Sequence, residues 1–149
     1  FYFNFIIQFI MEDTKKLEVM QAHTAPCLVT LGGKATSFSS EPAELKMSFK
    51  ATEEFTHSET KIVQGGFVTG MLDACMAHLV MCLYDFKVSP MTLDLTVNFL
   101  ASSHPGELEA VAKITKLGGS IGFLYAELFQ DGKMVATSTS TVKLVHHKS

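Results

Sequence analysis

Residues 64–86 have the sequence QGGFVTGMLDACMAHLVMCLYDF, which is as long as a helix and apolar on nearly every side. A helix that is apolar all round is a buried helix, so we expect this segment to run through the core. Its 23 residues could also span a membrane. Asp73 and His78 at the centre and two glycines at the start argue against that alternative, and we expect no membrane partner.

Alternating apolar and polar residues predict strands on both sides of this helix. The short turns between the later strands, Asp131-Gly132 above all, are typical of hairpins and predict a four-stranded antiparallel meander. Because no second layer is available to cover the helix, one sheet of about six strands must curl around it, which is an α+β fold. The other expected elements are a helix over residues 11–25 and strands over residues 35–40, 44–56, 91–101, 107–117, 120–130 and 133–145.

The composition favours one globular domain over residues 11–149. The chain has 149 residues, of which 47% are hydrophobic, and a net charge of −3. All twelve basic residues are scattered lysines, so we expect no nucleic-acid partner. The cysteines lack metal-ligand spacing and are typical of small core residues in a reducing compartment, which predicts a cytoplasmic protein without a metal site; they are Cys27, Cys75 and Cys82.

Residues 1–10 differ from the rest of the chain, since eight of the ten are apolar. The segment is too short to span a bilayer and has neither the basic start nor the cleavage site of a signal peptide. We expect an appendage, a remnant of cloning or of upstream translation, with a functional anchor as the alternative. Its β-prone composition predicts that, if ordered, it lies in an apolar groove or against a neighbouring chain.

Asp73 is the main candidate for chemistry. Burying an unpaired carboxylate is costly, so such a group has a specific partner, a raised pKa or a function. Gly66, Gly70 and Ala77 lie on the same helix face, and these small residues leave room for another molecule. The alternative is a carboxylate that bonds a hydroxyl or an amide in a subunit interface and does no chemistry. His78 lies on a different face and is expected to be a core histidine.

Gln64-Gly65-Gly66 opens the same helix. Free N–H groups at a helix start can polarise a carbonyl oxygen and stabilise the oxyanion that it becomes. Eight residues of helix separate Gly65 from Asp73 by about 12 Å, so one chain cannot present both groups to one carbonyl. A second copy related by a two-fold axis could supply the missing group.

From about residue 30 to 145 the sequence resembles the hotdog-fold acyl-CoA thioesterases, in particular their phenylacetate-degradation (PaaI-like) branch. The resemblance lies in the order of the elements and in Gly65-Gly66 followed, after six residues, by Asp73. Residues 92–100 (TLDLTVNFL) resemble the family's strand after the helix, and residues 131–136 (DGKMVA) its last hairpin.

The resemblance implies roles for individual residues. Asp73 would be the nucleophile or general base, the Gly65 amide would polarise the thioester carbonyl, and Thr92 would help to place water. The substrate-binding positions fall on the helix start and the loop before it. Gln64 stands where the family usually has His, and Ser58 where it usually has Asn, with His57 as the alternative. The expected substrate-binding residues are Ser58, His57, Gln64 and Gly66.

The resulting prediction is hydrolysis of acyl-CoA thioesters to free acid and CoA, in a site shared between two chains. We expect a homo-oligomer, a dimer that assembles into a tetramer, as the resemblance implies. No metal or redox cofactor is expected, and coenzyme A takes part as a portion of the substrate. The alternative is a non-catalytic acyl or acyl-CoA binding module on the same fold, which the departures at Gln64 and Ser58 favour.

Overall fold

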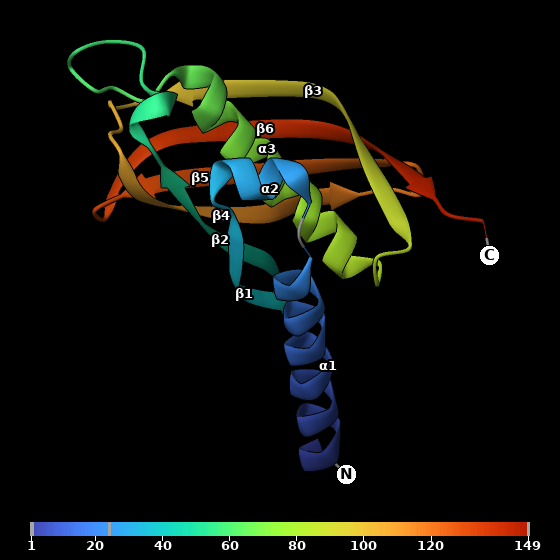
Figure 1. The fold of residues 1–149 in the computed structure, drawn as a ribbon. Helices are drawn as coiled ribbons and strands as arrows, with labels where there is room; N and C mark the ends of the chain where they lie inside the picture. The colour runs from blue at the N-terminus through green and yellow to red at the C-terminus, as the bar shows by residue number, and fades with distance from the viewer. Residues whose placement is uncertain (1, 24, 149) are drawn as a thin grey trace.

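The computed structural model describes residues 2–23 and 25–148, with side chains from residue 12 onward in these ranges. Within them it contains three α-helices, a short 3-10 helix and six strands (Figure 1). The elements are α1 (Tyr2–Ala22), α2 (Pro26–Leu31), β1 (Lys34–Ser40), β2 (Ala43–Ala51), the 3-10 helix η1 (Glu53–Phe55), α3 (Gly65–Leu83), β3 (Val88–Phe99), β4 (Gly106–Leu117), β5 (Ile121–Gln130) and β6 (Lys133–His146).

The six strands form one antiparallel sheet with the order β1-β2-β4-β5-β6-β3. This sheet curls around α3 (Figure 1), which confirms the predicted α+β hotdog fold. The predicted meander is correct only for β4, β5 and β6. The sequence pattern places β3 beside β4, but β3 pairs with β6 and β4 pairs with β2. Residues 100–105 connect β3 to β4, and six extended residues can span up to about 20 Å, enough to cross the end of the curled sheet.

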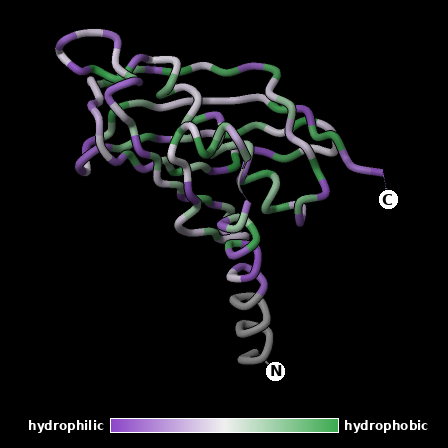
Figure 2. The backbone as a smooth tube through the Cα atoms, in the orientation of Figure 1, coloured by the Kyte–Doolittle hydropathy of each residue, from purple (hydrophilic) through white to green (hydrophobic). Residues whose placement is uncertain are grey.

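Helix α3 lies at the centre of the core, as its composition predicts. Leu72, Cys75 and Leu79 have no exposed surface, and they pack against inward-facing residues of the sheet such as Leu45 and Met47. By length and composition α3 could cross a membrane, but half of its apolar window is buried inside the protein, as in the core helix of a globular domain. Figure 2 shows the hydrophilic character of the loop that precedes α3.

The amino-terminal region differs from the prediction in two respects. Helix α1 starts at Tyr2 rather than Met11, so residues 2–10 continue the helix instead of forming an extended segment, and this part of α1 projects away from the sheet (Figure 1). Helix α2 is not predicted by the sequence pattern, because its six residues are too few to establish a periodicity. Strand β2 is shorter than expected, since residues 53–55 form η1.

The two edge strands of the sheet differ in whether another element covers them. Side chains of α1 cover the edge strand β1: Asp13 Oδ2 accepts a hydrogen bond from Ser40 N–H at 3.1 Å, and Gln21 Nε2 donates one to Ala35 O at 3.1 Å. No described element covers the opposite edge, β3, where Met91 and Leu93 are 55% and 60% exposed. An open apolar strand edge is a ready template for another chain.

Candidate active site

The structure brings two of the predicted catalytic residues together. Thr92 Oγ1 of β3 donates a hydrogen bond to Asp73 Oδ1 of α3 at 2.8 Å. Thr92 faces the helix because its cross-strand partner Val142 is buried, and directly opposed residues lie on the same face of a sheet. Asp73 is half-buried, and its second oxygen, Oδ2, has no hydrogen-bond partner among the described residues. That oxygen is free to accept a proton from water or to attack a carbonyl carbon.

The start of α3 contains the main-chain amides that are the candidate oxyanion donors. Gln64 is the N-cap, and its Oε1 accepts a hydrogen bond from Gly66 N–H at 2.6 Å. Gly65 N–H has no hydrogen-bond partner among the described residues. Gly65 is therefore the one glycine of the pair whose amide is available to an oxyanion.

A side chain at either of these glycines would meet a close neighbour. A Cβ on Gly66 would lie 2.6 Å from Gln64 Oε1, and one on Gly65 would lie 3.1 Å from the Phe99 ring. The cap made by Gln64 also changes the interpretation of that residue. Its carbonyl oxygen already accepts a hydrogen bond from its own helix, and its Nε2 group has no partner among the described residues.

A cavity of about 240 Å³ opens beside Gly65. Its walls are mostly apolar, with Val68 from α3 and Phe99 from β3, and Ser102 and Ser103 add two hydroxyl groups. An apolar cavity next to a free amide suits an acyl group whose carbonyl oxygen points to the amide.

The structure keeps Asp73 and Gly65 apart within one chain. They are eight residues apart on a continuous helix, a separation of about 12 Å along its axis. A carbonyl bound at Gly65 is therefore out of reach of the carboxylate of the same chain.

The remaining predicted site residues, His57 and Ser58, lie on the exposed loop before α3. Ser58 Oγ lies 2.6 Å from Thr60 Oγ1, and the main-chain N–H of His57 donates to Ile62 O at 3.1 Å. Within one chain the side chains of His57 and Ser58 therefore make no hydrogen bond to either proposed catalytic group, Asp73 or Gly65.

His78 is a core residue, as predicted. It is 5% exposed, and its Nδ1 lies 2.6 Å from Ala74 O, so Nδ1 carries the hydrogen. Burial lowers the pKa of His78 below its ordinary value, and His23, with its ring centroid 5.8 Å away, adds to this effect. Among the described residues, no group of three His, Cys, Asp or Glu side chains is placed to hold a metal ion.

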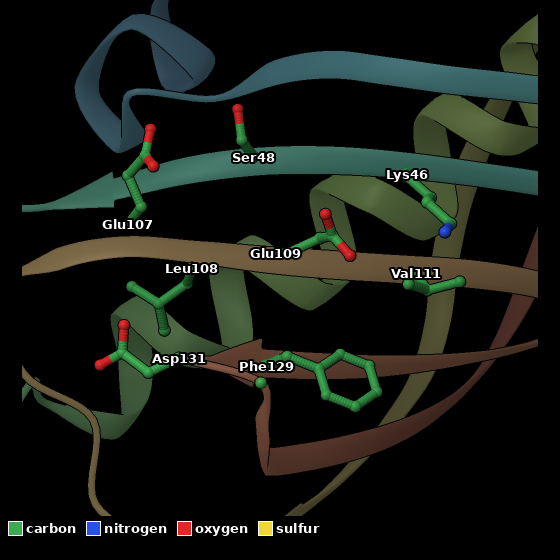
Figure 3. Close-up of a pocket in the computed structure, with 9 residues that line it drawn as sticks. Lys46, Ser48, Glu107, Leu108, Glu109, Val111, Phe129 and Asp131 are labelled. Atoms are coloured by element: carbon green, nitrogen blue, oxygen red, sulfur yellow. The ribbon is translucent and has the colours of Figure 1, made fainter.

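A larger groove lies elsewhere, on the face of the sheet that points away from α3. It has a volume of about 500 Å³ and is lined by carboxylates, Glu107, Glu109 and Asp131, with Lys46 and Phe129 beside them (Figure 3). It offers neither a helix start nor an activated nucleophile. The predicted cleavage of a thioester, which needs an oxyanion donor, therefore favours the smaller cavity at Gly65 over this groove.

Residues 60–137 match the family model of the thioesterase superfamily, which is more than half of the chain. The chain belongs to the thioesterase superfamily. The match includes both Asp73 and Gly65, and it confirms that the predicted family is correct. A comparison with curated protein sequences gave no significant match.

Solved structures agree with this membership. A phenylacetic acid degradation-related protein from Ralstonia eutropha JMP134 is 32% identical to this thioesterase, with a TM-score of 0.79 over 86% of this chain and 98% of that one. The PaaI protein of the phenylacetic acid degradation operon of E. coli shares its fold at 18% identity, with a TM-score of 0.78 over 93% and 96% of the two chains. A thioesterase from Haemophilus influenzae shares the fold at 15% identity, with a TM-score of 0.77 over 88% and 90%.

Phe99, Ser102 and Ser103 line the cavity, although the sequence pattern does not predict any of them as a site residue. Phe99 is the last residue of a strand, and the two serines belong to the turn after it. These residues are 34 or more positions away from Gly65 in the sequence, so local patterns do not indicate that they lie beside the start of α3. The resemblance of residues 92–100 to a family strand was the one signal that could have placed Phe99 near the site.

Proposed function

We propose that this thioesterase hydrolyses acyl-CoA thioesters to the free acid and CoA, in a site that two chains build together. Membership of the thioesterase superfamily implies that the protein hydrolyses thioesters. The acyl-CoA substrate and the shared site are the parts that we add.

The observation that carries the shared site is the placement of Asp73. Thr92 holds its carboxylate against β3, the uncovered edge of the sheet, while the free Gly65 amide lies about 12 Å away on the same helix. A second chain that packs along β3 with its own α3 running in the opposite direction would bring its helix start towards Asp73. A two-fold axis then generates two identical sites, each with one Asp73 and one Gly65.

The exposed apolar residues of β3 support the same dimer. Met91 and Leu93 would be covered by a partner strand, and main-chain groups on the free edge would gain hydrogen bonds. We further propose that two such dimers assemble into a tetramer, as the family resemblance implies.

In the proposed reaction the thioester oxygen accepts a hydrogen bond from Gly65 N–H. Asp73 of the other chain removes a proton from a water molecule, whose oxygen then adds to the carbonyl carbon. The tetrahedral intermediate collapses, the C–S bond breaks, and the CoA sulfur leaves with the proton. Direct attack by the Asp73 carboxylate on the carbonyl carbon is the alternative route. It breaks the C–S bond and releases the CoA thiolate, which is protonated by solvent, and the acyl-aspartyl anhydride that remains is hydrolysed by water to the free acid and the carboxylate of Asp73.

The features of the cavity support an acyl group as the bound portion, since Val68 and Phe99 give it apolar walls. The phosphates of CoA would be held by lysines, hydroxyls and main-chain amides, because the chain contains no arginine. We propose no metal or redox cofactor for this reaction, because water, a carboxylate and an amide are sufficient. A cytoplasmic location is part of the proposal, and the three free cysteines support it.

A non-catalytic acyl-CoA binding module is the second candidate. The hydrogen bonds of Gln64 to its own helix and of Ser58 to Thr60 favour it, because they occupy groups that the substrate could otherwise use.

Turnover of a panel of acyl-CoAs by the wild-type protein and by Asp73→Asn decides between the two candidates. We expect measurable hydrolysis by the wild type and a loss of about a hundredfold or more in the variant, since Asn keeps the volume but is neither base nor nucleophile. Binding of acyl-CoA without turnover by the wild type would instead establish the binding module. Equal turnover by both proteins would exclude Asp73 as the catalytic residue.

A further inference from the structure

The position of the Gly65 amide depends on two hydrogen bonds of the residues just before it. Val63 N–H donates to Ser103 O at 2.8 Å, and Gln64 N–H donates to Phe55 O at 2.8 Å. The position of the helix start therefore depends on the position of the Ser103 carbonyl group.

Residue 104 is held by a glutamine from a distant hairpin. Gln130, at the end of β5, accepts a hydrogen bond at Oε1 from His104 N–H at 2.9 Å. Its Nε2 donates to His104 O at 2.7 Å and makes a longer contact of 3.4 Å with Glu107 O. One side chain thus binds both main-chain groups of the residue that follows Ser103.

His104 extends this connection to the loop before α3. Its Nδ1 lies 3.1 Å from Lys61 O, and because a carbonyl oxygen can only accept, Nδ1 carries the hydrogen. Lys61 has a φ of 54°, which is uncommon for a residue other than glycine, so its carbonyl direction needs support from its surroundings. The ion pair of Lys61 with Glu53 lies at the surface, where such pairs contribute little.

We propose that Gln130 and His104 are positioning residues that fix the Gly65 amide and the Ser102–Ser103 wall of the cavity. This inference rests on the proposed function, in which Gly65 N–H binds the thioester oxygen. Neither side chain lines the cavity, so neither is expected to touch the substrate. Displacing a donor by even about 1 Å can lower the rate by up to about a hundredfold.

The test compares Gln130→Leu with the wild type in the whole 149-residue chain, using the best acyl-CoA of the panel. We expect kcat to fall about tenfold or more while KM changes by less than about threefold, because the loss concerns the transition state. Gln21→Leu is the matched control. It removes a comparable side-chain bond to the main chain, that to Ala35 O in β1, and is expected to keep wild-type kcat.

A second pair of variants isolates the His104 side chain. His104→Asn can keep a donor near the position of Nδ1 and is expected to retain most of kcat, whereas His104→Leu should lose about as much as Gln130→Leu. Independently of activity, hydrogen exchange at the Val63 amide should be faster in Gln130→Leu and His104→Leu than in the wild type.

The possible failures are distinguishable. Wild-type kcat in Gln130→Leu and His104→Leu, together with loss of activity in Asp73→Asn, would overturn this inference and leave the proposed function standing. A lower kcat with unchanged exchange at Val63 would also overturn it, since the effect would not pass through the helix start. A wild type without turnover would overturn the proposed function and this inference with it.

Discussion

Thr92 Oγ1 donates a 2.8 Å hydrogen bond to Asp73 Oδ1, and this bond joins the middle of the central helix to the open edge of the sheet. It leaves Oδ2 of Asp73 without a partner among the described residues. A hydroxyl that only oriented a structural carboxylate in an interface would make the same contact. A catalytic and a structural Asp73 differ in their response to loss of the Thr92 hydroxyl, because only in the first case does the rate of hydrolysis fall.

Thr92→Val tests this difference. Val keeps the shape of Thr but cannot donate, so Asp73 loses an orienting bond, and we expect kcat to fall about threefold to tenfold, which corresponds to the net free energy of one ordinary hydrogen bond, roughly 0.5–1.5 kcal/mol. Thr92→Ser keeps the hydroxyl and should remain near the wild-type rate. Steady-state kinetics on one acyl-CoA provides the measurement, and equal rates for all three proteins would show that Thr92 does not orient a reacting carboxylate.

The pH dependence of stability tests the burial of His78. Because burial lowers the pKa of His78 below its ordinary 6.5, the unfolded chain binds more protons than the folded one as the pH falls below that value. The contribution of His78 is therefore complete above about pH 6.5 and is lost as the pH falls towards the lowered pKa.

The measurement is the free energy of unfolding in urea at several pH values between 5 and 7.5. We expect wild-type stability to decrease on acidification, and the decrease to be smaller in His78→Asn, which does not titrate but can still donate to Ala74 O. An identical pH dependence in both proteins would contradict a buried, neutral His78. His23 and Asp73 face the same ring, and both remain in the variant.

Cysteine reactivity should separate the three thiols. Burial raises the pKa of Cys75 and raises that of Cys82 to about 12, so neither forms a thiolate at neutral pH. Cys27 is exposed. We expect iodoacetamide to label only Cys27 in the native protein and all three after denaturation, as determined by peptide mass spectrometry. Rapid native labelling of Cys75 would contradict the packing of α3 on the sheet.

The fold is largely predictable because local patterns determine it. A segment apolar on every side predicts a buried helix, and alternation with Asp131-Gly132 predicts the last hairpin. The strand order is less predictable, because the six residues of the β3–β4 connection are compatible with either neighbour for β3. Helix α2 cannot be predicted, because its six residues are too few to show a repeat of apolar positions.

The candidate site is predictable only in part. Asp73 and Gly65 stand out because a carboxylate in an apolar helix and glycines at its start are unusual. The sequence does not indicate that Gln64 caps the helix, since the usual N-cap residues have short side chains, namely Ser, Thr, Asp and Asn. The bonds between His104 and Gln130 connect residues 26 positions apart, and no local pattern reveals them.

Replacement of Gly65 separates the role of its amide from that of its size. Gly65→Pro removes the N–H, and proline is tolerated at the first position of a helix; Gln64 already has the extended backbone that precedes a proline, with ψ of 138°. We expect a loss of about a hundredfold in kcat, the typical cost of one oxyanion donor. Gly65→Ala adds a Cβ at the same 3.1 Å from the Phe99 ring but keeps the N–H, so a similar loss in this control would indicate crowding instead.

Hybrid dimers of Asp73→Asn and Gly65→Pro chains test the shared site most directly. Each variant alone should be nearly inactive, and equal amounts allowed to exchange subunits should recover about a quarter of the wild-type activity. At random half of the dimers are hybrids, and each hybrid has one of its two sites intact. Subunit exchange is verified by native mass spectrometry of chains of different mass. No recovery of activity in a mixture that contains hybrids would contradict a site built from Asp73 of one chain and Gly65 of the other.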